Sequence, residues 1–346
     1  MIELRSDTFT MPTPQMLEAM TTAELGDDVY GEDPTVARLE TRAAELVGQQ
    51  AACFVPSGTM ANLCAILAQV DRGRAVIAGD RSDLYYFEAG GPSVLGGVVL
   101  RPVRNLPDGT LEPQRLMEEL TLDRSDAQFA IPAMLCVETT HNMCGGVPLA
   151  VEYLKQIRAT ADEHGVLLHV DGARIFNAAI AMNVPASQIG GLADSVQFCL
   201  SKGLGAPVGS IVAASTEIID QARRVRKMLG GGMRQVGVLA AAGLLALERI
   251  DDRLAADHQH ARAFAESIAE GGVRVLNDPP AANVVFFRIG NGTRHAEFLR
   301  HCAAQGVAAL ELDPGRVRVV FHNGVSTEDA VVAADVVRRA AVLATG

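Results

Sequence analysis

The segment VLLHVDGAR at residues 166–174 is followed later in the chain by SVQFCLSKG at residues 195–203. Each segment begins with a mostly apolar run, which is typical of a buried strand. Each then reaches a charged residue, Asp171 in the first segment and Lys202 in the second. Because ligands of α/β sheets bind outside the carboxyl ends of the strands, the pattern predicts that both side chains lie at this edge.

The chemistry of Asp171 and Lys202 suits pyridoxal phosphate. A lysine amine can join the aldehyde of this cofactor as a Schiff base, and it can lose its proton when it is partly desolvated. A carboxylate beside the pyridine nitrogen favours the protonated ring, which withdraws electrons from the α-carbon of a bound substrate. Taken singly, an aspartate here is often a helix cap and a lysine a solvated surface group. Their order and positions together predict an enzyme that uses pyridoxal phosphate.

A small-residue turn at Ser57, Gly58 and Thr59 predicts a phosphate-binding site. It lies between an apolar run at residues 51–55, which indicates a buried strand, and a helical pattern at residues 60–70. Backbone amides and hydroxyl groups therefore gather at a helix N-terminus, which favours an anion. An ordinary capped helix is the alternative interpretation of the same turn.

The order of the predicted elements indicates an α/β chain with two unequal domains. Further elements are expected as strands at residues 75–78, 134–137, 209–213, 283–289 and 316–321 and as helices at residues 33–47, 151–164, 235–250, 294–305 and 326–343. The alternation of strands and helices predicts a largely parallel sheet wrapped by helices. Because 346 residues exceed one typical domain, we expect a large cofactor-binding domain at residues 1–250 and a smaller C-terminal α+β domain at residues 251–346.

Composition and charge argue against several classes of protein. The net charge of −11 disfavours sequence-independent binding of nucleic acid, which requires a basic surface. The six cysteines lack the paired spacing of metal ligands, so we expect reduced thiols and no metal site. No apolar segment reaches the length of a membrane span, and the N-terminus lacks a basic stretch followed by an apolar run. A cytoplasmic enzyme without a membrane or nucleic-acid partner is therefore expected.

Several longer motifs, spread over nearly the whole chain, resemble those of low-specificity L-threonine aldolases. They are LRSDT (residues 4–8), GDDVYG (26–31), SGTMAN (57–62), THN (140–142), HVDGARIFN (169–177), LSKGLGAPVGS (200–210) and GGGMRQ (230–235). The resemblance implies an aminotransferase-like fold (fold type I), whose large domain holds a mostly parallel seven-stranded sheet. It also implies cleavage of a β-hydroxy-α-amino acid, of the L-threonine or L-allo-threonine type, to glycine and an aldehyde. A homotetramer built from two dimers, with shared active sites, is implied as well.

The resemblance further implies roles for particular residues. Those implied to hold the cofactor are Lys202, Asp171, Arg174, Ser57, Gly58 and Thr59, with Lys227 and Arg234 from a neighbouring subunit. Those implied to bind the substrate are Ser6, Arg318, His141, Tyr30 and Tyr85, with Tyr30 again from a neighbour. The candidate catalytic residues are Lys202, His141, Asp83 and Arg174. Ser6 and Arg318 would hold the carboxylate, because a guanidinium can bind it through two parallel hydrogen bonds. His141 would face the substrate hydroxyl, and Arg174 would lie beside the phenolic oxygen of the cofactor.

The chain departs from the family pattern in three places that are expected to surround the pocket. Asp83 stands where a histidine commonly stacks over the cofactor ring, and Thr139 stands where asparagine is usual. The third departure is FHNG at residues 321–324, where the family typically has THLD. Asp83 could act as an acid or base, bind a cationic or hydroxylated substrate, or point away while Tyr85 or Tyr86 covers the ring.

The leading hypothesis is retro-aldol cleavage that depends on pyridoxal phosphate. Asp83 leaves open a different reaction on the same scaffold, such as β-elimination, racemisation or C–C bond formation in specialised metabolism. A third hypothesis is a catalytically silent binding or structural protein, and the intact set of Lys202, Asp171 and Arg174 argues against it.

Overall fold

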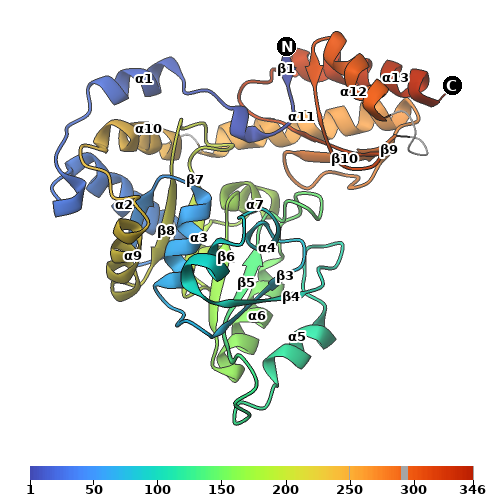
Figure 1. The fold of residues 1–346 in the computed structure, drawn as a ribbon. Coiled ribbons are helices and arrows are strands. Elements are labelled where there is room, and N and C mark those ends of the chain that lie inside the picture. The colour runs from blue at the N-terminus through green and yellow to red at the C-terminus, as the bar shows by residue number, and fades with distance from the viewer. Residues whose placement is uncertain (249, 290–294, 346) are drawn as a thin grey trace.

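A seven-stranded sheet forms the centre of the larger part of the protein (Figure 1). The computed structural model describes residues 1–248, 250–289 and 295–345. In spatial order the strands are β2 (Ala51–Val55), β8 (Ser210–Ala214), β7 (Ser195–Cys199), β6 (Leu167–Asp171), β5 (Pro132–Glu138), β3 (Ala75–Gly79) and β4 (Val99–Val103). β8 runs antiparallel to β2 and β7, and the other neighbours run parallel. The predicted α/β fold with a mostly parallel seven-stranded sheet is confirmed.

Helices cover both faces of this sheet, because alternate residues of its strands point to opposite sides. In β2, Cys53 and Val55 pack in the hydrophobic cluster under α3 and α9, whereas Ala52 and Phe54 belong to the larger cluster on the other face. The helices of this part are α1 (Pro14–Thr21), α2 (Pro34–Val47), α3 (Gly58–Leu67), α4 (Asp83–Tyr86), α5 (Pro113–Leu120), α6 (Val151–His164), α7 (Ile175–Met182), α8 (Ser187–Gly190), α9 (Thr216–Met228) and α10 (Gly237–Glu248). Shorter helical turns are η1 (Asp7–Phe9), η2 (Asp28–Tyr30) and η3 (Pro92–Gly96).

Asp33 and Gly48 begin and end α2, as the sequence predicted. The carboxylate of Asp33 accepts hydrogen bonds from the amides of Thr35 and Val36, each at 3.1 Å. Gly48 then ends the helix with a φ of 72°, a left-handed conformation that glycine adopts without strain. The expected helix at residues 33–47 is therefore confirmed.

A smaller antiparallel sheet, drawn at the upper right of Figure 1, carries the last part of the chain. Its strands, in spatial order, are β12 (Leu310–Asp313), β13 (Arg316–Val320), β10 (Val284–Arg288) and β9 (Arg274–Val275). The accompanying helices are α11 (Ile250–Glu270), α12 (His295–Ala304) and α13 (Thr327–Thr345). Phenylalanine rings fill the space between sheet and helices, with Phe264 5.4 Å from Phe321 and 6.3 Å from Phe287 between ring centroids. This second hydrophobic cluster is separate from those of the large sheet.

The N-terminal segment joins the two parts of the protein. β1 (Ile2–Glu3) pairs in parallel with β11 (Val307–Ala308), and Leu4 is buried in the second hydrophobic cluster. A few residues later the hydroxyl of Thr10 donates to the carbonyl oxygen of Lys202 at 3.1 Å. Residues 4–10 therefore run from the small sheet to the loop after β7.

Most predicted elements match the structure, with instructive differences. β4 was missed because Val99 is 42% exposed and Pro102 interrupts the apolar pattern. The helix expected at residues 235–250 corresponds to α10, and the domain boundary expected near Ile250, where α11 begins, stays a prediction. Arg294, the expected start of another helix, lies outside the described residues. In the described ranges no helix has both the length and the apolar composition needed to cross a bilayer.

Replacing Phe264 by alanine should lower the free energy of unfolding by about 3–5 kcal/mol, because it leaves a cavity among packed aromatic rings. Urea or thermal denaturation followed by circular dichroism measures the loss. Phe129→Ala is the matched control, since Phe129 is 40% exposed and its removal should change stability by less than about 0.5 kcal/mol. Equal effects of the two substitutions would contradict this account of the second cluster.

Candidate active site

The register of three neighbouring strands places polar side chains in one row. Glu138 at the end of β5 lies opposite Asp171 at the end of β6, and Asp171 lies opposite Gln197 of β7. Lys202 follows β7 in the next loop. A cavity of about 160 Å³ opens here, lined by Ser57, Gly58, Thr59, Asp83, Phe87, Glu88, Asp171, Ala173, Gln197, Cys199, Ser201 and Lys202. The structure thus brings Asp171 and Lys202 together with the turn that was predicted to bind phosphate.

Three donors hold the buried carboxylate of Asp171. Asn62 Nδ2 donates to Oδ2 at 2.8 Å, and the amide of Ala173 donates to Oδ1 at 3.1 Å. Gln197 Nε2 also donates to Oδ1. Burial raises the pKa of Asp171, and the charge of nearby Asp83 raises it further. A cationic partner in the cavity would offset the free energy needed to keep this carboxyl group ionised.

Asn62 connects Asp171 to a buried polar network. Its Nδ2 also donates to Glu88 Oε1 at 2.8 Å, and its Oδ1 lies 2.9 Å from Nε2 of His169. His169 Nδ1 lies 2.8 Å from the hydroxyl of Ser195. Burial lowers the pKa of His169 to about 4, so at neutral pH the uncharged ring donates from Nε2 to Asn62 and accepts from Ser195. The hydrogen bond from His169 therefore fixes the orientation of the Asn62 amide, whose nitrogen faces the carboxyl groups of Asp171 and Glu88.

The N-terminus of α3 forms another wall of the cavity. Ser57 caps this helix by accepting a hydrogen bond from the amide of Met60 at 3.2 Å. A Cβ atom at Gly58 would lie 2.8 Å from Sγ of Cys199, so only glycine fits here. The hydroxyl of Ser210 is buried and lies 3.8 Å from the position of that Cβ atom. Its neighbour is the thiol of Cys199, and a thiol is a weak hydrogen-bond partner. Amides at a helix start together with such a hydroxyl can hold a phosphate group.

Arg174 and Asp7 form a fully buried ion pair. Arg174 Nε donates to Asp7 Oδ2 at 2.7 Å, and Nη2 donates to Oδ1 at 2.6 Å. Burial alone would raise the pKa of Asp7, but the guanidinium outweighs it and holds this pKa well below its usual value. The resemblance placed Arg174 beside the cofactor and the substrate, and the structure adds a carboxylate that holds two of its nitrogens.

Arg318 on β13 is buried without an anionic partner in the described part of the chain. Its Nη1 donates to Oδ1 of Asn142 at 2.8 Å, and Nη2 donates to the carbonyl oxygen of Arg5 at 3.1 Å. Nε has no hydrogen-bond partner. Burial lowers the pKa of Arg318 to about 10, and the charge of Arg174 contributes. Ser6 follows Arg5 in the chain, so both residues implied to hold a carboxylate lie in the same region.

His141 is buried, and neither of its ring nitrogens has a hydrogen-bond partner in the structure as described. Its Nδ1 lies 3.8 Å from Oε1 of Glu138, beyond hydrogen-bond distance. Burial lowers the pKa of His141 to about 4, so the imidazole is uncharged at neutral pH. An uncharged, unpartnered imidazole can accept a proton or a hydrogen bond from a ligand.

Of the three departures from the family pattern, only Asp83 lines the cavity in the described chain. Thr139 is fully buried, and its hydroxyl accepts a hydrogen bond from the amide of Leu149 at 3.0 Å, so its place beside the pocket stays a prediction. The same holds for residues 321–324, where Nε2 of His322 lies 2.8 Å from the carbonyl oxygen of Glu3. The contacts of both departures help to hold the fold together.

Tyr30 and Lys227 lie apart from Lys202 in a second cavity of about 720 Å³. The guanidinium of Arg234 lies 5.8 Å from the centre of the Tyr30 ring. Tyr30 is 74% exposed, so a neighbouring molecule could contact it. Tyr85 is half-exposed and does not line the cavity with Lys202, where Phe87 stands instead. The roles of these residues in a neighbouring site or toward a substrate stay predictions.

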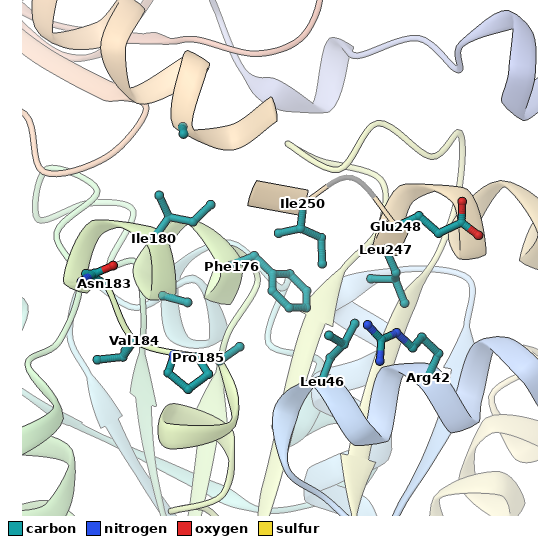
Figure 2. Close-up of a pocket in the computed structure, with 13 residues that line it drawn as sticks. Arg42, Leu46, Phe176, Ile180, Asn183, Val184, Pro185, Leu247, Glu248 and Ile250 are labelled. Atoms are coloured by element: carbon teal, nitrogen blue, oxygen red, sulfur yellow. The ribbon is translucent and has the colours of Figure 1, made fainter. Parts of the chain in front are cut away.

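A larger cavity, of about 860 Å³, lies elsewhere, between α2, α7, the end of α10 and the start of α11 (Figure 2). Leu46, Phe176, Leu247 and Ile250 point toward it from these helices, with Arg42 at its margin (Figure 2). Its described lining contains none of the residues that the sequence analysis expected to bind cofactor or substrate, and its charged residues Arg42 and Glu248 are exposed. Size alone therefore does not identify the reactive site, whereas the chemistry around Lys202 does.

Asp7, Asn62 and Asn142 are site residues that the sequence analysis did not single out. Each belongs to one of the motifs that carried the family resemblance. Each also contacts a partner far along the chain, as Asn142 does with Arg318. Their place inside these motifs is the signal that could have identified them.

Comparison with known proteins agrees with this geometry. The fold and the site define a lyase of the beta-eliminating lyase family, which the chain matches over residues 3–291. Low-specificity L-threonine aldolase 1 of Arabidopsis thaliana is 44% identical over 95% of the chain and 93% of its own length. The low specificity L-threonine aldolase of Escherichia coli K12 is 45% identical over 95% of the chain and 96% of its own length. The chain belongs to the low-specificity L-threonine aldolase family.

A solved structure supports the fold independently. The threonine aldolase of Leishmania major superposes with a TM-score of 0.84 over 99% of this chain and 100% of its own, at 22% sequence identity. At this identity the likeness concerns the fold.

Replacing Asp7 by asparagine should lower the free energy of unfolding by about 3–5 kcal/mol, because it leaves the buried Arg174 without its counter-charge. Denaturation in urea at neutral pH provides the measurement. Asp162→Asn removes a carboxylate that is 67% exposed and paired with Arg158, and it should cost less than about 1 kcal/mol. A small effect of Asp7→Asn would contradict a structural role for the buried pair.

Proposed function

We propose that this protein cleaves a β-hydroxy-α-amino acid of the L-threonine or L-allo-threonine type to glycine and an aldehyde, with pyridoxal phosphate as cofactor. The observation that carries the proposal is that Lys202 and the buried Asp171 line one cavity, to which Asn142 connects Arg318 through Asp83. Arg318 is buried and has no anionic partner in the described residues. Membership of the aldolase family supports the same reaction. The proposal also requires that the residues present fit the cofactor.

The donor set fits pyridoxal phosphate. Lys202 supplies an amine for the aldehyde, and a protonated ring nitrogen would provide the cation that Asp171 lacks. The start of α3 at Gly58, with Thr59 and Ser57, suits the phosphate. When bound, the cofactor supplies an electron-withdrawing ring that accepts the electrons of a bond broken at the α-carbon of the substrate.

Arg318 and Ser6 are proposed to orient the substrate through its carboxylate. The Nε atom of Arg318 is unpartnered, and the uncompensated charge of the guanidinium favours an anion. Fixing the carboxylate limits rotation about the bonds of the α-carbon, and the orientation decides which of these bonds is weakened. Arg174 is already held by Asp7, so it is proposed to contribute a positive charge in a fixed position.

His141 is proposed to take the proton from the β-hydroxyl group. As the bond between the α- and β-carbons breaks, the β-oxygen loses this proton and becomes the carbonyl oxygen of the aldehyde. The α-carbon gains a proton and becomes the methylene carbon of glycine, so the reaction balances without water or an oxidant. A base in the right position typically contributes about 10²–10⁴-fold to the rate.

We also propose that the protein is a cytoplasmic homotetramer, built from two dimers, in which neighbours complete each other's sites. Tyr30, Lys227 and Arg234 are the residues expected to act on a neighbouring subunit. The exposed ring of Tyr30 and the separate cavity that it lines support this arrangement. The six cysteines are all unpaired, which agrees with a reducing compartment.

Lys202→Ala should abolish both covalent attachment of the cofactor and turnover, because no other amine lines the cavity in the described chain. Borohydride reduction followed by mass spectrometry of the peptides detects the attachment independently of activity. Lys155→Ala, at an exposed position of α6, is the control and should retain both properties. An adduct at a residue other than Lys202 in the wild-type protein would overturn the assignment.

Incubation of the holoenzyme with L-threonine and with L-allo-threonine should yield glycine and acetaldehyde in equal amounts, because cleavage forms one molecule of each. Chromatography of derivatised products measures both. A 2-oxo acid with ammonia, or an epimerised amino acid, would instead point to the alternative reactions on the same scaffold. Absence of glycine and acetaldehyde from both substrates would reject the proposed reaction for the threonine type.

A further inference from the structure

Asp83 is a carboxylate of the cavity that forms no ion pair in the described part of the chain. It is half-buried and lines the cavity with Lys202 and Asp171. Its Oδ1 accepts a hydrogen bond from Nδ2 of Asn142 at 3.0 Å, and no ion pair of this carboxylate occurs within residues 1–248, 250–289 and 295–345. A carboxylate in such a site favours a ligand that brings a positive charge.

Three cations lie near Asp83, and none of them forms an ion pair with it in the described residues. Lys202, Arg174 and Arg318 all lie within electrostatic range of Asp83. Both Nε and Nη2 of Arg174 are bound to Asp7. In the proposed function Lys202 gives its amine to the cofactor, and Arg318 gives its charge to the substrate carboxylate. Asp83 therefore has no ion-pair partner of its own in the described residues, and a cation at the end of a substrate side chain would not have to displace one.

Asn142 places Asp83 close to the substrate. Its Oδ1 accepts from Nη1 of Arg318 at 2.8 Å, while its Nδ2 donates to Asp83 at 3.0 Å. A single amide group thus separates the residue proposed to bind the carboxylate from Asp83. A substrate anchored at Arg318 has the rest of its length within reach of this second charge.

The neighbouring acidic groups disfavour an additional anion. The backbone amide of Asp83 donates to Oε2 of Glu138 at 2.7 Å. Burial and the charge of Asp83 raise the pKa of Glu138 well above its usual value, and burial together with Asp171 raises that of Glu88 to about 8. Adding a negatively charged side chain to this group is unfavourable, whereas a positively charged one is attracted.

We infer that Asp83 selects β-hydroxy-α-amino acids whose side chain ends in a cation, such as the 3-hydroxy derivatives of ornithine and lysine. The inference rests on the proposed function, because it takes the same bond to be cleaved. With 3-hydroxylysine, the bond between the α- and β-carbons breaks, the hydroxyl proton is lost, and the α-carbon gains a proton. The products are glycine and 4-aminobutanal, and no oxidant or reductant is required.

The direct test compares kcat/KM of the holoenzyme for 3-hydroxylysine and for 3-hydroxynorleucine, which has the same carbon chain without the amine. A charge-assisted hydrogen bond to Asp83 predicts a preference for the amine of about tenfold or more. Asp83→Asn should bring the ratio close to one, because it removes the charge and keeps an acceptor for Asn142. Asp162→Asn, an exposed position of α6, should retain the preference.

A binding measurement separates this inference from the proposed reaction. L-Lysine and L-norleucine lack the β-hydroxyl group, so neither can be cleaved, and calorimetry with the holoenzyme gives the Kd of each. Tighter binding of lysine by about tenfold, lost in Asp83→Asn, supports the inference even if no retro-aldol product is found.

The inference is overturned if the wild-type protein binds lysine and norleucine equally, or if the preference persists in Asp83→Asn. Cleavage of threonine without any preference for the amine would leave the proposed function standing and remove only the role of Asp83. Because equal binding by the wild-type protein is already decisive, the test does not depend on the folding of the variant.

Discussion

The parallel register of β5, β6 and β7 is the constraint on which the site depends. It sets Glu138, Asp171 and Gln197 side by side at one edge of the sheet, and the loop after β7 brings Lys202 to the same edge. A buried carboxylate there requires hydrogen-bond donors, since an unpaired one would be costly. Asn62 meets part of that need, and its orientation in turn depends on His169. The site is thus built outward from the ends of the strands.

The N-terminal segment contacts both this site and the part of the protein that contains the small sheet. Leu4 is anchored in the second hydrophobic cluster, and Asp7 forms its ion pair with Arg174 three residues further along. Thr10 then binds the backbone of Lys202. Burial makes the charged pair costly to break, so the position of one short segment links the stability of both parts of the protein to the geometry of the cavity.

Several polar groups of the site lack the partners that burial normally requires. Nε of Arg318, both ring nitrogens of His141 and one oxygen of Glu88 are unsatisfied in the described structure. Leaving such groups unpaired costs free energy in the folded protein, and binding a ligand that pairs with them recovers part of it. Among the described residues that line the larger cavity beside Phe176, no buried polar atom lacks a hydrogen-bond partner, so the volume of that cavity does not by itself indicate a ligand (Figure 2).

Local patterns in the sequence determined the strands that end at Asp171 and precede Lys202, the cap of α2 at Asp33, and the existence of a helix after the turn at Ser57. That helix begins at Gly58, two residues before the predicted start. These features follow from the periodicity and backbone preferences of neighbouring residues. Only the tertiary structure decided that Asp7 pairs with Arg174, and that Asn142 stands between Asp83 and Arg318. Such contacts join residues far apart in the chain, and they depend on how whole elements pack, which no local pattern encodes.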